Sequence, residues 1–317
     1  MKAKTIKAII GKKIEEWLAS IEDEKVRELA RDNTIVTGGC IASMLLKEQV
    51  NDFDIYFRTK ETAKAVAAYY VARFEIKDKA GIPCNITLDD SPDYKGEDRL
   101  RIVVKSAGVA SENGTKKPYE YFESRADQEA SEYLDEVMQD PGAAQDTLEA
   151  TQKAVSEQQD EGAAYRPVFL STNAITLSRR VQLVLRFFGK PEEIHKNYDF
   201  IHCTNYWTSW DKALVLNQPA LESLLAKELR YVGSKYPVCS MFRLRKFIAR
   251  GWTVNAGQIV KIAMQISELD LSKVQVLEDQ LVGVDVAYFC QLIERLKEND
   301  PEKINSAYLC EILDRMF

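Results

Sequence analysis

The sequence has little of what a membrane-bound or exported protein needs. Its apolar runs all fall well short of the roughly 18 residues of a membrane-spanning helix, so we expect no membrane partner. The lysine-rich start, MKAKTIKAIIGKKIEEWLAS, contains early acidic residues, and no small-residue cleavage site follows an apolar stretch. Because a signal peptide would have both an apolar core and such a site, we expect none here, and we expect a cytoplasmic location.

Metal-binding side chains of the zinc type are also scarce. The chain has two histidines, His195 and His202, and its six cysteines include no CxxC pair. Structural zinc requires clustered cysteine and histidine ligands, so a zinc site is not expected, and the cysteines are interpreted as reduced, mostly buried thiols. The sequence also lacks the GxxxxGK[ST] motif, which argues against a P-loop enzyme.

Charge is distributed unevenly along the chain. The segment from Glu120 to Glu161 has thirteen acidic and two basic residues, a net charge of −11, so the rest of the chain carries +5. Such an acidic segment is typical of a surface excursion, and residues 120–161 are a candidate contact for a protein partner.

The stretch from Lys227 to Lys261 has the opposite charge. It contains eight basic residues against Glu228 alone, and five aromatic residues are interleaved with them. Basic and aromatic side chains together could follow an RNA backbone. Equally, the aromatic residues could form a helix core while the basic residues face water.

Hydrophobic periodicity predicts an α+β protein. Residues 5–31 have helical spacing; TIVTGG and DFDIYFR are typical of strands, and the segment after each is helical in composition. Further strands are expected at CNITL, RLRIVVK, VFLSTNAITL, VQLVLRFF and YDFIHC, with a polar insertion at about 110–162. After residue 206 the pattern is helical. The expected domains are an N-terminal helix over 1–32, a core over 33–206 and a helical domain over 207–317.

Two aspartates stand inside an otherwise apolar strand. In NDFDIYF, Asp52 and Asp54 are two residues apart, so in a strand both carboxylates would lie on one face, about 6–7 Å apart along the backbone. Aspartate is disfavoured in strands and two like charges repel, so the pair calls for a cation. Magnesium is the natural candidate, because it binds carboxylates and takes its remaining ligands from water and substrate phosphates.

Two glycines lie before this strand in the sequence, separated from it by one expected helix. Gly38 and Gly39 have no Cβ and let the backbone approach a bulky anion, and the helix that follows would direct its free amides and positive dipole end toward a phosphate. Ser43 lies one turn further on, where its hydroxyl could bind the same phosphate or a backbone group. These residues predict a nucleotide site between the glycine turn and the aspartates.

A hydrophobic strand, Gly-Gly, a helix, a gap of thirteen positions from Gly39 to Asp52 and an alternating aspartate strand together resemble the signature of DNA-polymerase-beta-like nucleotidyltransferases. The segment FFGKPEEIHKNYDFIHCTNYW also resembles nucleotidyltransferase-like proteins of large tailed phages. The resemblance implies an α+β fold, in which a mixed-sheet palm with the acidic insertion is followed by an all-helical domain. For a phage protein, the expected location is the host cytoplasm.

The resemblance further implies a third carboxylate on a later strand beside the first two. Asp199, in NYDFIHC, is the first candidate, and Asp89 and Asp90, at the end of CNITLDD, compete with it. The three acids would hold two Mg²⁺ ions, or Mn²⁺. Arg243 and Lys246, three positions apart in FRLRKFIARGW, would share one helix face and reach the nucleotide.

The function that these features predict is transfer of NMP from an NTP to an acceptor hydroxyl. The basic region 227–261 makes an RNA 3′ end the first candidate acceptor. A protein or small-molecule hydroxyl is the alternative, and from a different class stands a non-catalytic module that binds a nucleotide or a protein. No histidine base is required, because metal coordination lowers the pKa of the hydroxyl.

Overall fold

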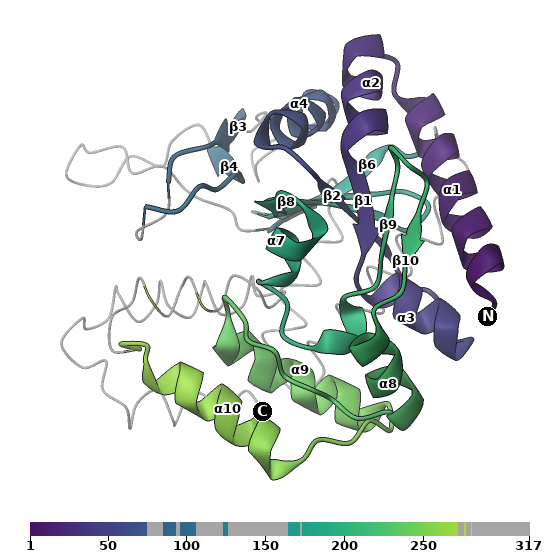
Figure 1. Ribbon diagram of the computed structural model, residues 1–317. Coiled ribbons are helices and arrows are strands. Elements are labelled where there is room, and N and C mark those ends of the chain that lie inside the picture. Colours follow the sequence, from purple (N-terminus) through teal and green to yellow (C-terminus); the bar gives the residue numbers. More distant parts are fainter. Residues whose placement is uncertain are drawn as a thin grey trace, which may run out of the picture.

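The structure is a computed structural model that describes residues 1–74, 85–92, 96–105, 123–125, 164–171 and 173–271, together with 276 and 280. It contains an eight-stranded mixed sheet in the order β10-β9-β1-β2-β8-β7-β6-β5 and a separate two-stranded sheet of β3 and β4 (Figure 1). The strands are β1 (Thr34–Thr37), β2 (Phe53–Phe57), β3 (Asn85–Asp89), β4 (Arg101–Lys105), β5 (Glu123–Arg125), β6 (Pro167–Ser171), β7 (Ala174–Leu177), β8 (Val181–Phe188), β9 (Tyr206–Thr208) and β10 (Leu214–Val215).

The centre of the large sheet joins two distant parts of the chain. Strand β1 pairs antiparallel with both β2 and β9, whereas β2 pairs parallel with β8. A parallel neighbour cannot be reached by a tight turn, and β8 follows β2 only after more than a hundred residues, which include strands β3 to β7. The expectation of an α+β fold with a mixed sheet is confirmed.

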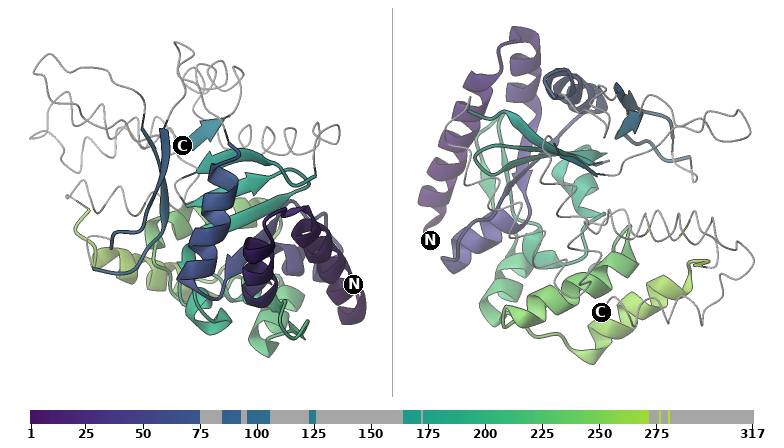
Figure 2. Two further views of the ribbon diagram at one scale, coloured as in Figure 1. Left: turned by 90° about the horizontal axis from the view of Figure 1, so that it is seen from above. Right: turned by 180° about the vertical axis from the view of Figure 1, so that it is seen from behind.

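The helices surround this sheet in two groups, as two further views make clear (Figure 2). Helices α1 and α4 pack on one face of the sheet, and α8, α9 and α10 form the other half of the molecule. The helices are α1 (Ala3–Ser20), α2 (Glu24–Asn33), α3 (Gly39–Leu46), α4 (Lys60–Val71), α7 (Pro191–His195), α8 (Gln218–Ala226), α9 (Pro237–Ala249) and α10 (Ala256–Ser267), with a 3₁₀ turn η1 (Ile201–Cys203).

The N-terminal helix expected over 5–31 is two helices. The break comes where the Asp23 carboxylate accepts hydrogen bonds from the backbone N–H groups of Lys25 and Val26, at 2.9 and 3.1 Å. An aspartate in extended conformation that satisfies the free amides of the following turn is an N-cap, so a new helix begins here.

Alternation along the strands separates the two faces of the sheet. Ile55 and Leu183 lie on the face that packs with α1 and α4 in the main hydrophobic core, where both are fully buried. Tyr56 and Val184 lie on the opposite face, with Ile194 of α7. Because successive side chains of a strand point to opposite faces, Asp54 lies on the same face as Tyr56 and away from the main core.

The strand expected at YDFIHC was wrong. The Asp199 carboxylate accepts a hydrogen bond from the N–H of Phe200 at 3.0 Å, and Ile201–Cys203 forms η1. Backbone bonds to a distant segment outweigh the strand-like composition here, since Ile201 donates to the carbonyl of Arg230 at 3.1 Å.

The chain after residue 206 is also not purely helical. Strands β9 and β10 extend the sheet beyond β1, and the first helix of the C-terminal part, α8, starts only at Gln218. That helix was expected to continue through KELRYVG but ends at Ala226, where Lys227 adopts a left-handed conformation with φ 48°. Helices α9 and α10 occur where they were expected.

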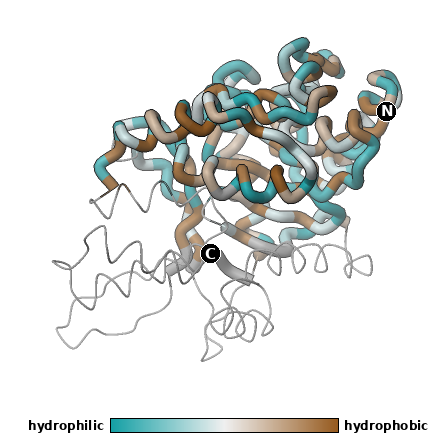
Figure 3. Tube along the Cα trace, turned by 90° about the horizontal axis from the view of Figure 1, so that it is seen from below, coloured by the Kyte–Doolittle hydropathy of each residue, from teal (hydrophilic) through white to brown (hydrophobic). Residues whose placement is uncertain are grey.

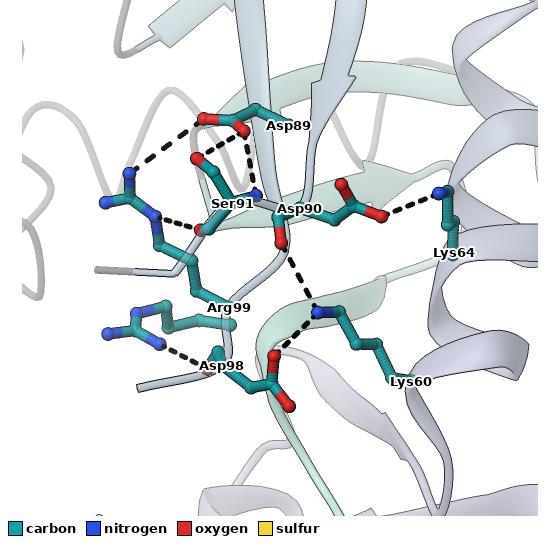
Figure 4. A network of polar contacts seen from close by, with 8 residues as sticks. Lys60, Lys64, Asp89, Asp90, Ser91, Asp98 and Arg99 are labelled. Carbon is teal, nitrogen blue, oxygen red and sulfur yellow. Dashed lines mark hydrogen bonds and ion pairs between the residues drawn. The ribbon is translucent and has the colours of Figure 1, made fainter. Parts of the chain in front are cut away.

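The small sheet of β3 and β4 is tied to α4 by ion pairs (Figure 4). Lys64 contacts the Asp90 carboxylate at 2.6 Å, and Lys60 contacts that of Asp98 at 2.8 Å. Within the sheet, Asp89 accepts from Arg101 Nε at 2.6 Å. These contacts hold the end of CNITLDD against α4.

The helical half has its own apolar cluster, which includes Phe200, Leu224, Leu244, Trp252 and Ile262. Along its described helices, hydrophobic and hydrophilic positions alternate, as the view from below shows (Figure 3). Among the described helices, none is long and apolar enough to cross a membrane. Apart from residues 123–125, the acidic insertion at about 110–162 lies outside the described residues, as do the last two expected helices.

Candidate functional site

Gly38 lies directly against the carboxylate of Asp54. Gly38 has φ +93° and ψ −152°, a conformation that side-chain-bearing residues rarely adopt, and a Cβ built on it would be 2.8 Å from Asp54 Oδ2. Its N–H donates to the carbonyl of Cys203 at 3.1 Å. The first glycine of the pair is therefore required both by the turn and by the close approach of the carboxylate.

The environment of Asp54 disfavours its negative charge. Burial raises the pKa of Asp54 to about 7, and the neighbouring charge of Asp52 adds to the increase, while Lys246 and Arg243 lower it. The two α9 cations therefore lie on the same side of the sheet as the aspartates but do not fully compensate them. A divalent cation between the two carboxylates would supply the missing positive charge.

Asp52 differs from Asp54 in its position. Strand β2 begins at Phe53, so Asp52 lies one residue before the strand, where it is exposed. The expected strand contains only one of the two aspartates. Asp52 is nevertheless close enough for its charge to raise the pKa of Asp54, so the two acids form one site.

The helix expected after the glycine pair begins within the pair, at its second glycine. Gly39 is the first residue of α3 and Gly38 its N-cap, and nothing lies within 4 Å of a Cβ built on Gly39. The free N–H groups of this helix end are available to an anion. Ser43 is the fifth residue of the helix and is buried. Its contact with a phosphate remains a prediction.

Asp199 and Arg243 form a half-buried ion pair. Arg243 Nη1 donates to Asp199 Oδ2 at 2.7 Å, and the Asp199 side chain is only 12% exposed. Arg243 also lowers the pKa of Asp54, so its charge acts on Asp54 as well as on Asp199. Asp199 therefore has one carboxylate oxygen already bound by an arginine whose charge also reaches the candidate site.

The competing acids are engaged elsewhere. Asp89 accepts from Arg101 and from the backbone and hydroxyl of Ser91, and these bonds hold its pKa below the usual range despite burial. Asp90 is paired with Lys64. Asp89 ends β3 of the small sheet and Asp90 follows it, so neither lies on a strand beside β2.

Sequence reasoning missed Gln182. This residue of β8 is in register with Asp54 across the parallel pairing of β2 and β8. It therefore occupies the position beside Asp54 where a third carboxylate on the neighbouring strand would stand. The available signal was one of two polar residues, with Arg186, in the otherwise apolar run VQLVLRFF, but the register of Gln182 could not be derived from the sequence. In the part of the chain that the structure describes, no group of three His, Cys, Asp or Glu side chains is placed to hold a metal.

Most of the basic residues in the 227–261 stretch have acidic partners. Lys227 and Arg250 contact Glu48 at 3.4 and 3.0 Å, and Arg230 contacts Glu222 at 3.0 Å. Lys235 is paired with Glu97, and Arg243 with Asp199. Their aromatic neighbours Tyr231, Tyr236 and Trp252 are buried. Much of the positive charge is therefore compensated within the molecule.

The two histidines have structural contacts. His195 Nε2 is 2.8 Å from the Thr37 hydroxyl, and the ring of His202 packs 4.3 Å from that of Trp252 and 4.8 Å from that of Phe247. Burial lowers the pKa of each histidine to about 4, so both are neutral at pH 7.

The order of strand, glycine turn, helix and strand, set in a mixed sheet, places this chain among α+β proteins. More particularly, the profile of the Gabija anti-defense 2 family (Gad2) matches residues 8–227, so the chain belongs to that family. A relative named "Gabija anti-defense 2", from Bacillus phage SPbetaL7, is 22% identical over 128 residues, which cover 39% of this chain and 32% of that protein. The chain thus spans about a third of the length of this curated relative.

Solved structures to which the chain is similar include two CCA-adding enzymes. The Thermotoga maritima enzyme complexed with tRNA has 10% identity and a TM-score of 0.35, covering 91% of this chain and 54% of that one. The Bacillus stearothermophilus enzyme in complex with CTP has 11% identity and a TM-score of 0.34, covering 84% and 48%. The family assignment rests on the sequence match and not on these similarities.

Proposed function

We propose that this chain is a divalent-cation-dependent nucleotidyltransferase that counteracts a bacterial defence, by transferring NMP from an NTP to an acceptor hydroxyl with release of pyrophosphate. The observation that carries the proposal is the position of Asp54, which lies against the Gly38 turn, beside Asp52 and within reach of the charges of Arg243 and Lys246 on α9. The anti-defence role is inferred from the family to which the chain belongs.

The donor set fits magnesium or manganese. Asp52 and Asp54 offer carboxylate oxygens, which these ions prefer, and the raised pKa of Asp54 indicates a need for positive charge. When bound, the ion supplies charge compensation for the phosphates and the attacking oxygen. Asp52 and Asp54 would hold it; the NTP is the substrate.

The protein groups around the aspartates bind and orient the nucleotide. The free N–H groups at the start of α3, after Gly38 and Gly39, bind phosphate oxygens, and Ser43 adds a hydroxyl. Lys246 attracts the triphosphate, and Arg243, held in place by Asp199, presents a second cation on the same helix. These roles predict that removing either cation lowers nucleotide affinity.

An RNA 3′ end remains the first acceptor to test, because Arg245 and Lys261 in the basic stretch are exposed. A hydroxyl of a defence protein or of a small molecule is the alternative. The compensation of most basic residues in the stretch favours this alternative, since fewer charges are available to RNA phosphates.

A label-transfer assay tests the proposal. Purified protein with Mg²⁺ or Mn²⁺ and each α-labelled NTP is offered RNA and an extract of cells that carry the Gabija defence. The wild type is expected to label one acceptor class and Asp54→Asn to label none. Asp90→Asn, a change directly after β3, should behave as the wild type. If labelling decreases steeply as salt is added, this result would favour RNA as the acceptor.

The non-catalytic alternative is favoured by one observation, the presence of Gln182 instead of a carboxylate beside Asp54. A plaque assay in Gabija-carrying cells separates the two functions. If catalysis is the mode of action, expression of the wild type restores phage growth and Asp54→Asn does not. Equal rescue by both proteins, together with no label transfer, would support a module that acts by binding alone.

A further inference from the structure

A row of polar side chains crosses the sheet at the candidate site. Thr37 on β1 is in register with Asp54 on β2, Asp54 with Gln182 on β8, and Gln182 with Thr176 on β7. Residues in register on neighbouring strands point to the same face, and the strands are about 4.8 Å apart. Of the four positions in this row, only Asp54 carries a charge.

The row determines which groups can reach a cation beside Asp54. Gln182 is its in-register neighbour on β8 and has a neutral amide, whose carbonyl oxygen can accept but adds no negative charge. Thr37 on the other side already donates to the carbonyl of Asn205 at 2.9 Å and lies 2.8 Å from His195. Neither neighbour supplies a second carboxylate in the row.

The other acids considered for this role are bound by cations. Asp199 Oδ2 accepts from Arg243 at 2.7 Å, and Asp89 Oδ2 accepts from Arg101 at 2.6 Å. Two divalent ions about 3.5–4 Å apart repel each other strongly and need a set of carboxylates to hold both. When both are ionised, Asp52 and Asp54 carry two negative charges, enough to balance one divalent ion.

We infer that the site holds one divalent cation, between Asp52 and Asp54, and that Gln182 occupies the position whose carboxylate would be needed to hold a second. This inference rests on the site of the proposed function and replaces the pair of ions that the sequence resemblance implies. Gln182 is a specificity-determining residue here: it sets the number of ions.

Equilibrium dialysis against Mn²⁺, with a non-hydrolysable NTP analogue at equal concentration on both sides, counts the bound ions per chain. The wild type is expected to bind about one ion. Gln182→Glu, which restores a carboxylate in the row, is expected to bind about two. Thr176→Glu places the same charge on β7, one strand spacing of about 4.8 Å further from Asp54 than Gln182, and this variant is expected to remain at about one ion.

The remaining variants make the outcome decisive. Gln182→Ala should still bind about one ion, because the amide is not the ligand that holds it, and Asp54→Asn should bind none. Two ions in the wild type would overturn the inference, and a drop to one in Asp199→Asn would then identify Asp199 as the third ligand. One ion in a folded Gln182→Glu would also overturn it. No ion in the wild type would instead refute the cation site of the proposed function.

Discussion

Replacing Gly38 with alanine should damage both the fold and the candidate site. Gly38 has φ +93° and ψ −152°, in a region that is essentially restricted to glycine. Any other residue held in this conformation destabilises the folded state by about 1–3 kcal/mol. We expect Gly38→Ala to lower the free energy of unfolding by this amount, a large part of the roughly 5–15 kcal/mol that stabilises a typical domain.

The added methyl group should also move Asp54. The new Cβ would be 2.8 Å from Asp54 Oδ2, far inside normal contact distance, and a carboxylate at the end of its side chain moves more easily than the backbone of the turn. The carboxylate would therefore be displaced from its position beside Asp52. We expect Mn²⁺ binding to weaken even under conditions in which the variant is fully folded.

Gly39→Ala is the matched control. Nothing lies within 4 Å of a Cβ at Gly39, and the residue is already helical, so alanine should leave stability unchanged or raise it by up to about 1 kcal/mol. Urea unfolding followed by circular dichroism measures stability, and dialysis measures Mn²⁺ binding. The reasoning fails if the two alanine variants are equally stable and bind Mn²⁺ equally well.

Three further predictions concern groups outside the glycine turn. Burial lowers the folded-state pKa of His202 to about 4 from 6.5, so its contribution to stability is present above pH 6.5 and is lost as pH falls toward 4. Urea unfolding at pH 7 and pH 5 should show a smaller loss of stability for His202→Phe than for the wild type. Equal losses would contradict the lowered pKa of His202. Arg243→Ala should cost about 1–3 kcal/mol by leaving Asp199 without its arginine, and adding Asp199→Asn should recover part of that cost, whereas strictly additive effects would show that the pair is not coupled. Tyr70→Phe should cost about 1–3 kcal/mol, because the buried indole N–H of Trp17 donates to the Tyr70 hydroxyl at 2.9 Å; unchanged thermal stability would count against that bond.

The parts of the fold that could be predicted from the sequence are those governed by local patterns. Strand β1, the glycine turn, α3 and β2 occur in the expected order, because apolar alternation and glycine position act over a few residues. The break between α1 and α2 also had a local signal, since Asp23 is a good N-cap residue, but the surrounding helical periodicity obscured it.

The features that could not be predicted depend on contacts between distant residues. YDFIHC alternates like a strand, yet its backbone bonds to residues near 230 produce a 3₁₀ turn instead. The bond between Arg243 and Asp199 joins positions 44 apart, and the register of Gln182 with Asp54 depends on a parallel pairing across a long excursion. The aspartate pair was therefore predictable from local sequence, but the groups that surround it were not.

The pairing order of the central sheet also fixes when the candidate site can form during synthesis. Strand β1 ends at Thr37, but its partner β9 ends at Thr208, and Gly38 bonds to Cys203. At about 5–20 residues per second, the ribosome needs roughly 10–35 s to make the intervening chain. For most of that interval β1 has no β9 and β2 has no β8 to pair with. Two apolar strand edges therefore stay open in the nascent chain, which makes this interval the stage at which chaperones would protect the protein from aggregation.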